Sequence, residues 1–439
     1  MLILVVASLL AFYLAWNLGA NDVANSMGTS VGSKAVTLRQ ALLIAGILEF
    51  AGAVLFGREV STSLATKLVN SASVATMPAV LITGMLSVLL ACGVWLNIAT
   101  FKGLPVSSSH AVVGAIAGFA CVAFGPQTVA WRFIGVISLS WVVTPLISAA
   151  IAALFYSQIK YWILDHPDAE AQLREWIPWL SVALFSSFGI IVFPTVVERF
   201  FVMPLPVPSH TVSLLMGTIA VAGLTFYSWF YLEALGAKSR ESGVGDVGVS
   251  VIQKPPLQTL SSSYVYPLTE SLLARLQVLS ACFVAFAHGS NDVGNAIAPL
   301  AVIAYTLRTG SVPLEGFQVP LWILVLGGTG IVIGLAVWGK KVIATIGEGI
   351  LPLQPSGGFC AELATGITIL VASWLGLPVS TSHALVGSVV GIGLIQNPRA
   401  VRLQTLRAIG LAWVVTVPLA ALIGAVMFSV SHWLTLSYD

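Results

Sequence analysis

Apolar stretches long enough to cross a membrane recur along the whole 439-residue chain. Only 8% of the residues are charged and 57% are hydrophobic, whereas soluble domains carry about 25% charged residues. A helix needs about 20 apolar residues to span a bilayer. Twelve such stretches are found at 2–20, 39–57, 77–100, 105–124, 131–157, 177–197, 209–236, 273–303, 320–338, 359–375, 379–396 and 405–431. The sequence therefore predicts an all-α polytopic protein of the lipid bilayer with about 12 transmembrane segments, and the segments beside Pro105 and Pro378 are candidate half-spans.

The basic residues divide unevenly between the two sides that these twelve segments define. Loops on the side opposite residue 1 carry 14 of the 19 Lys and Arg residues. Cytoplasmic loops are enriched in Lys and Arg, so we expect both termini to be extracytoplasmic. We expect the host to be a plasma (inner) membrane. The formal net charge of +2 is too small to indicate a nucleic-acid partner.

The chain contains an internal duplication. GANDVAN at 19–25 returns as GSNDVGN at 289–295, and GLPVSSSHAVVGAIAGF at 103–119 returns as GLPVSTSHALVGSVVGI at 376–392 with 11 of 17 positions identical. We predict an N-terminal transmembrane repeat at 1–157, a middle region at 158–271 with two further spans and a cytoplasmic linker (237–271), and a C-terminal repeat at 272–439. The first segment and its copy are seven crossings apart, so the repeats should be inverted, as in many secondary transporters.

The first duplicated motif places a carboxylate and two amides within an apolar segment. Its residues are Asn21, Asp22 and Asn25 in one copy and Asn291, Asp292 and Asn295 in the other. Positions i and i+3 share a helix face, and hard cations prefer carboxylate and amide oxygens. Ionisable residues inside membrane segments are usually functional. We therefore expect a coupling-cation site, with Na⁺ possible at Asp22, Asn25, Asp292 and Asn295. Interhelical hydrogen-bond clamps are the alternative.

Two glycines near the first motif suggest a break in its helix. The gap between Gly19 and Gly28 invites an unwound turn, which would free backbone carbonyls as further cation ligands.

The second duplicated motif carries hydroxyls behind Gly-Leu-Pro. Pro105 and Pro378 suit the first turn of a helix, which would leave the triplets at a helix N-terminus, where free N–H groups and the helix dipole attract anions. The candidate anion-binding residues are Ser107, Ser108, Ser109, Ser380, Thr381 and Ser382. Packing by small hydroxyl residues is the alternative. His110 and His383 end the motifs, and a hydrogen bond to a hydroxyl, a proton relay and a structural donor all remain open for them.

Two acidic residues lie in apolar segments without an acidic counterpart in the other repeat. They are Glu49 and Glu362. An intramembrane glutamate is costly, so a role in coupling or gating is expected, and pairing with a base such as Lys34 or Lys340 is the alternative. Thr100 and Ser373 precede the two Gly-Leu-Pro motifs and offer further hydroxyl ligands.

The paired G-x-N-D-V-x-N and G-L-P-V-S-x-S-H motifs resemble those of the PiT-type inorganic phosphate transporters. The resemblance covers both repeats. It implies twelve spans, two inverted repeats and a symporter that is no enzyme, needs no cofactor, and takes inorganic phosphate with Na⁺ or H⁺. It also implies that the Asn/Asp motifs serve the coupling cation, that the hydroxyl triplets serve phosphate, and that both glutamates are required for transport. A homodimer is possible.

Three other functions are weighed against phosphate symport. Some bacterial relatives with this fold carry sulfate, but phosphate monoanion can donate a hydrogen bond to a carboxylate and sulfate cannot. An anion channel does not need the paired acids. An intramembrane hydrolase is disfavoured because the chain has no G-x-S-x-G motif and a catalytic centre gains nothing from two copies.

Overall fold

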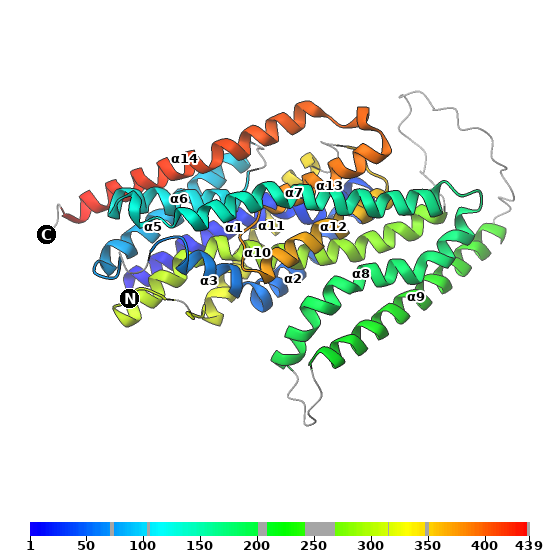
Figure 1. The fold of residues 1–439 in the computed structure, drawn as a ribbon, viewed down its shortest axis with the longest axis horizontal. Coiled ribbons are helices and arrows are strands. Elements are labelled where there is room, and N and C mark those ends of the chain that lie inside the picture. The colour runs from blue at the N-terminus through cyan, green and yellow to red at the C-terminus, as the bar shows by residue number, and fades with distance from the viewer. Residues whose placement is uncertain are drawn as a thin grey trace. The chain divides into compact units, whose positions relative to one another are not determined.

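The chain is helical almost throughout the part that the structure describes (Figure 1). The structure is a computed structural model that describes residues 1–70, 74–102, 106–200, 209–241, 268–314, 316–346 and 351–436. The α-helices are α1 (Leu2–Gly32), α2 (Leu38–Phe56), α3 (Arg58–Thr66), α5 (Pro78–Phe101), α6 (Ser108–Phe124), α7 (Trp131–Ile159), α8 (Ala169–Phe200), α9 (Ser209–Glu241), α10 (Leu268–Thr309), α11 (Leu321–Ile346), α12 (Pro355–Trp374), α13 (Thr381–Gln396) and α14 (Leu403–Leu436). Within these ranges, extended pairing is limited to one isolated bridge between Val69 and Val129. The all-α fold class is confirmed.

The chain forms two compact units. One contains Met1–Tyr156 together with Gln277–Asp439, and the other contains Ser157–Leu276. The first unit holds every motif residue, and the second consists mainly of the hairpin of α8 and α9. The predicted linker overlaps helix at both ends, because α9 extends to Glu241 and α10 begins at Leu268. Residues 242–267 lie outside the described residues, and the three-part division into two repeats and a middle region stays a prediction.

Each predicted span overlaps a helix, but the helices differ in length. Among the described residues, nine helices are long and apolar enough to cross a membrane, and α8 qualifies as a bent pair with a 50° change of direction. The helices α6 and α13 contain 17 and 16 residues, so each is about 25 Å long against a hydrocarbon core of about 30 Å. The chain is an integral membrane protein, while the count of twelve crossings stays a prediction.

The prediction of an unwound turn between Gly19 and Gly28 is wrong. Helix α1 is continuous over 31 residues. A Cβ atom on Gly19 would overlap the backbone carbonyl of Ile331 in α11, and one on Gly289 would overlap the carbonyl of Glu49 in α2. Small residues let membrane helices approach closely, so these glycines serve helix packing rather than a helix break.

The motif-bearing helices lie in the interior of the first unit. Within the most apolar 18-residue segment of each helix, 89% of the residues are buried in α12 and 67% in α10, against 22% in α14. In α1, every residue from Asn17 to Ser30 is buried. Polar groups buried in a membrane protein need partners from the protein itself, so the partners of these motifs define the site.

Candidate functional site

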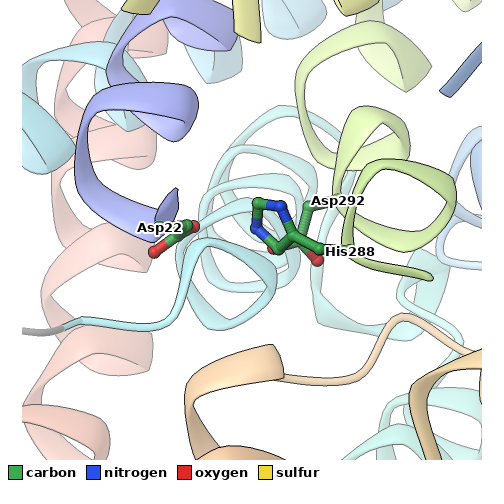
Figure 2. A group of neighbouring side chains, drawn as sticks. All are labelled: Asp22, His288 and Asp292. Atoms are coloured by element: carbon green, nitrogen blue, oxygen red, sulfur yellow. The ribbon is translucent and has the colours of Figure 1, made fainter. Parts of the chain in front are cut away.

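The two copies of the Asn/Asp motif meet at one point inside the protein. Asp22 projects from α1 toward the imidazole ring of His288, which lies beside Asp292 on α10 (Figure 2). A ligand atom from each of these three side chains lies within 4.8 Å of the others. Asp22, His288 and Asp292 are at most 2% exposed. Two segments 270 residues apart in the sequence therefore build one polar cluster.

Each Asn/Asp motif donates hydrogen bonds to the hydroxyl triplet of the other copy. Asn25 Nδ2 donates to Thr381 Oγ1 at 3.2 Å. Asn295 Nδ2 lies 3.2 Å from Ser108 Oγ and 3.0 Å from Ser109 Oγ. Thr381 Oγ1 in turn donates to Asp292 Oδ2 at 3.2 Å. We call the two motifs with the two triplets and His288 the central site.

The triplets begin their helices as predicted. Ser107 is the N-cap of α6 and accepts from the backbone N–H of His110. Ser380 is the N-cap of α13 and accepts from the backbone N–H of His383. The prediction that Pro378 lies in the first turn is wrong, because the Ser380 cap starts the helix at Thr381. Pro105 lies outside the described residues.

The two histidines after the triplets are tied to the backbone of the opposite repeat. His110 Nδ1 lies 3.3 Å from the carbonyl oxygen of Trp413, and His383 Nδ1 lies 3.0 Å from that of Trp141. Each ring also lies against a tryptophan ring, with centroids 3.8 Å apart for His110 and Trp141 and 3.5 Å for His383 and Trp413. These contacts favour the structural reading that the sequence left open.

The predicted hydroxyl ligands Thr100 and Ser373 bind asparagines of their own repeats. Asn21 Nδ2 donates to Thr100 Oγ1 at 2.8 Å. Asn291 Nδ2 donates to Ser373 Oγ at 3.0 Å. Asn21 and Asn291 therefore hold α1 and α10 to neighbouring helices, while Asn25 and Asn295 reach the triplets.

His288 is a site residue that the sequence motifs did not reveal. It lies four residues before Asp292, and its ring is completely buried between two acids. His288 Nε2 is 3.0 Å from Asp292 Oδ2, and Nδ1 is 3.2 Å from Glu49 Oε2. The duplication concealed it, because the matching position of the first repeat is Leu18. The sequence signal that could have revealed His288 is its i, i+4 spacing from Asp292, which places both side chains on one face of a helix.

Glu49 joins the central site, and its partners differ from the lysines weighed above. Besides His288, Ser26 Oγ donates to Glu49 Oε1 at 2.8 Å. Ser26 lies on α1 one residue after the first motif. Glu49 of α2 therefore links both motif helices.

Glu362 lies apart from the central site. Its Oε1 accepts from Thr29 and Ser30 hydroxyls at 2.6 Å each and from Gln277 Nε2 at 3.2 Å, and its Oε2 accepts from Ser280 at 2.8 Å. Thr29 follows Asp22 by seven residues, which is about 10 Å along α1. These four partners are neutral donors from α1 and α10, which differs from pairing with a lysine.

Several oxygens of the central site remain available to a cation. Asp22 Oδ2, Asp292 Oδ1 and Asn295 Oδ1 are buried and, within the described part of the chain, have no hydrogen-bond partner. An unsatisfied buried acceptor is costly, and hard cations take oxygen ligands at about 2.4 Å. The residue types thus fit a small hard cation.

Comparisons with known proteins give the family of the chain. Residues 18–424 match the model of the phosphate transporter family. The chain belongs to the phosphate transporter family. A putative phosphate permease of Haemophilus influenzae is 36% identical over 426 residues, which cover 97% of this chain and 96% of that protein. The chloroplastic inorganic phosphate transporter 2-1 of Arabidopsis thaliana is 37% identical over 95% of this chain and 70% of its own length.

A solved structure of a sodium-dependent phosphate transporter has the same fold. It superimposes on this chain with a TM-score of 0.82, at 35% identity, over 98% of this chain and 99% of its own. The resemblance to phosphate transporters noted in the sequence motifs is confirmed at the level of family and fold.

Proposed function

We propose that this member of the phosphate transporter family is a secondary active symporter of inorganic phosphate. A Na⁺ or H⁺ gradient drives it, and alternating access carries the substrate across the membrane. The observation that carries the proposal is the exchange of contacts between repeats, in which Asn295 of α10 bonds Ser108 and Ser109 of α6 while Asn25 of α1 bonds Thr381 of α13. Cation ligands and anion donors therefore share one buried site.

In this proposal the two hydroxyl triplets bind phosphate. Ser107 and Ser380 satisfy one backbone N–H at each helix start, so the N–H groups of Ser108, Ser109, Thr381 and Ser382 remain for a ligand. The positive ends of the α6 and α13 dipoles favour a multivalent oxyanion there. The hydroxyls of Ser108, Ser109 and Thr381 lie beside them.

The charge of the central site supports coupling to a cation. Asp22, Asp292 and Glu49 contribute three carboxylates, and His288 is their basic neighbour. When the carboxylates are ionised the site is net negative even with His288 protonated, and it repels a phosphate anion. A cation on Asp22, Asn25, Asp292 and Asn295 lowers that repulsion, so cation and phosphate bind best together. The solved relative is a sodium-dependent transporter, which favours Na⁺ over H⁺ as that ion.

Uptake of radiolabelled phosphate into proteoliposomes tests the proposal. A Na⁺ gradient and a pH gradient are imposed separately, each with the membrane potential clamped. We expect an inward Na⁺ gradient to accumulate phosphate above its external concentration. Accumulation under the pH gradient alone identifies H⁺ instead. Equilibration without accumulation under both gradients contradicts symport and indicates a channel.

A sulfate symporter is the second candidate. Helix N-termini and hydroxyls bind sulfate as well as phosphate, whereas the carboxylates of Asp22 and Asp292 favour an anion that can donate a hydrogen bond. Uptake of labelled phosphate in the presence of excess unlabelled sulfate distinguishes a phosphate symporter from a sulfate symporter. Phosphate uptake should persist in excess sulfate, and its loss favours the sulfate assignment.

Topology and assembly remain part of the proposal. The excess of Lys and Arg on the side opposite residue 1 favours extracytoplasmic termini in a plasma (inner) membrane, although one relative is named as chloroplastic. Labelling of single introduced cysteines with an impermeant reagent tests the orientation. A homodimer stays a prediction, tested by cross-linking in the membrane.

A further inference from the structure

A cavity with one arginine in its lining lies outside the central site. It has a volume of about 790 Å³ and is formed by the start of α1, the end of α10, the loop that follows and the start of α11. Its polar lining includes Tyr305, Arg308, Thr309 and Gln318. We call it the headgroup cavity. None of its lining residues belongs to the central site.

An apolar groove adjoins this cavity. It has a volume of about 410 Å³ and is lined by Leu4, Val5, Ser8, Leu9 and Trp322. Leu4 and Trp322 line both spaces, so the two adjoin. Val5 and Leu9 are 52% and 65% exposed, which marks this face of α1 as open to lipid. We call it the tail groove.

The headgroup cavity is suited to an anion. Arg308 is exposed and lines it. Arg58 of α3 donates to Gln318 Oε1 at 3.4 Å, and Arg58 Nε is buried without a hydrogen-bond partner among the described residues. The acidic residue of the adjoining loop, Glu315, lies outside the described residues. Arg308 therefore lines the cavity, and Arg58 contacts the lining residue Gln318. Among the described residues, no Asp or Glu lines the cavity.

The position of the two spaces fits the boundary between headgroups and acyl chains. The cavity lies where α10 ends and α11 begins, and Trp322 stands at that start. Tryptophan and arginine concentrate at this level of membrane proteins. From Leu4 to Leu9 the tail groove follows α1 for about 7 Å toward the middle of the chain's first span.

From this arrangement we infer that the two spaces together bind one anionic phospholipid. The phosphodiester binds Arg308 in the headgroup cavity, with Gln318 beside it, and one acyl chain lies in the tail groove between Leu9 and Trp322. Arginine binds phosphate oxygens through charge-assisted hydrogen bonds. Free phosphate would use the arginine but gain nothing from the apolar groove, so the position of the groove beside the cavity favours a lipid. The inference needs the membrane location of the chain and does not depend on the transported substrate.

Native mass spectrometry of the purified full chain tests the site. The protein in detergent is titrated with dioleoyl phosphatidylglycerol and, separately, with dioleoyl phosphatidylcholine. We expect tighter binding of phosphatidylglycerol, and R308Q should weaken that binding about fivefold, as expected for an exposed ion pair supported by apolar contact. R132Q is the matched control, because Arg132 is exposed near the start of α7 and does not line the cavity. The twelve predicted segments place Arg132 and Arg308 both on the side of residue 1.

A second variant tests the tail groove. L4W fills the space between the headgroup cavity and the tail groove. We expect it to weaken the binding of dioleoyl phosphatidylglycerol and to leave the binding of glycerophosphoglycerol, which has the headgroup but no acyl chain, unchanged. Thermal unfolding checks that both variants fold.

Three results would overturn the inference. The first is equal affinity of wild type and R308Q for phosphatidylglycerol, and the second is equal affinity of the wild type for both lipids. The third is equal affinity of the wild type for dioleoyl phosphatidylglycerol and for glycerophosphoglycerol, which would identify a site for the phosphate group alone.

Discussion

At the scale of single residues, His288 and Asp22 hold the central site together in different ways. His288 bridges two acids from different helices at 3.0 and 3.2 Å. Asp22 has one oxygen 3.4 Å from Asn25 Nδ2 and another without a partner in the described structure. One residue therefore balances charge inside the protein, and the other leaves charge for a ligand.

Substitution of Asp22 tests this difference. We expect D22N to abolish phosphate accumulation, because the amide removes the negative charge that a coupling cation needs. Folding should be retained, because Asn occupies the same volume and the lost oxygen has no partner to leave unsatisfied. Proteoliposome uptake measures the effect, and D165N at an exposed aspartate is the control. Normal accumulation by D22N would refute the assignment of Asp22 to the cation site.

Substitution of His288 should affect stability as well as transport. Removing one partner of a buried ion pair costs about 3–5 kcal/mol, and H288Q leaves both Glu49 and Asp292 without a cationic neighbour. We expect a clear fall in the unfolding temperature and loss of uptake. The double variant E49Q/H288Q should recover part of the unfolding temperature but not uptake, because it removes one of the unpaired acids.

The control for the two His288 variants is H166Q, which changes an exposed histidine. If H288Q leaves the unfolding temperature unchanged, His288 does not balance the charge of the two acids.

At the scale of helices, close contacts between α1 and α11 and between α2 and α10 set the positions of the motifs. Gly19 and Gly334 each lie against the backbone of the opposing helix, at Ile331 and Trp16. Gly289 lies against the backbone of Glu49. Gly19 and Gly289 are each the first residue of an Asn/Asp motif, and each lets its helix approach a neighbouring helix closely.

G19A should be strongly destabilising. Alanine is favoured over glycine by about 1 kcal/mol inside a helix, but its Cβ would overlap the Ile331 carbonyl, and overpacking costs about 1–3 kcal/mol or more. G410A in α14 is the matched control, because nothing lies within 4 Å of a Cβ there. Thermal unfolding in detergent should fall for G19A and hold or rise for G410A. Equal unfolding temperatures would contradict the packing role of Gly19.

At the scale of the whole molecule, the two intramembrane glutamates occupy different places. Glu49 belongs to the central site, while Glu362 is bound by neutral donors about 10 Å further along α1. Thr29 and Ser30 of α1 and Gln277 and Ser280 of α10 converge on Glu362 of α12. Three helices therefore meet at one carboxylate outside the central site.

E362Q should separate binding from transport. We expect uptake to fall at least about tenfold, equivalent to 1.4 kcal/mol. The NH₂ group of the new glutamine is a donor and would face side chains that themselves donate hydrogen bonds to Glu362. Equilibrium binding of phosphate by the purified protein should stay within about twofold, because no group of the central site changes. E170Q at an exposed glutamate is the control. An equal loss of binding and uptake would place Glu362 in the binding site itself.

The sequence by itself determined the membrane class, the helical segments and the pairs of motifs. Spans are set by runs of apolar residues, which are local properties, and the N-caps at Ser107 and Ser380 depend on contacts within three residues. The family follows from the same motifs. The prediction failed at Gly19, where packing against Ile331 of α11 decided the role of the glycine, and at Pro378, where the Ser380 cap set the helix start.

Only the tertiary structure decided which motif meets which. That Asn25 bonds Thr381 rather than a hydroxyl of its own repeat, and that His288 lies between Glu49 and Asp292, depends on how α1, α2, α10 and α13 pack. A repeat shows which residues are equivalent, but it carries no information on contacts between the copies. His288 has an apolar counterpart, Leu18, in the first repeat. Its role became visible only from its place between two buried acids, since polar groups inside a membrane protein depend on partners within the protein.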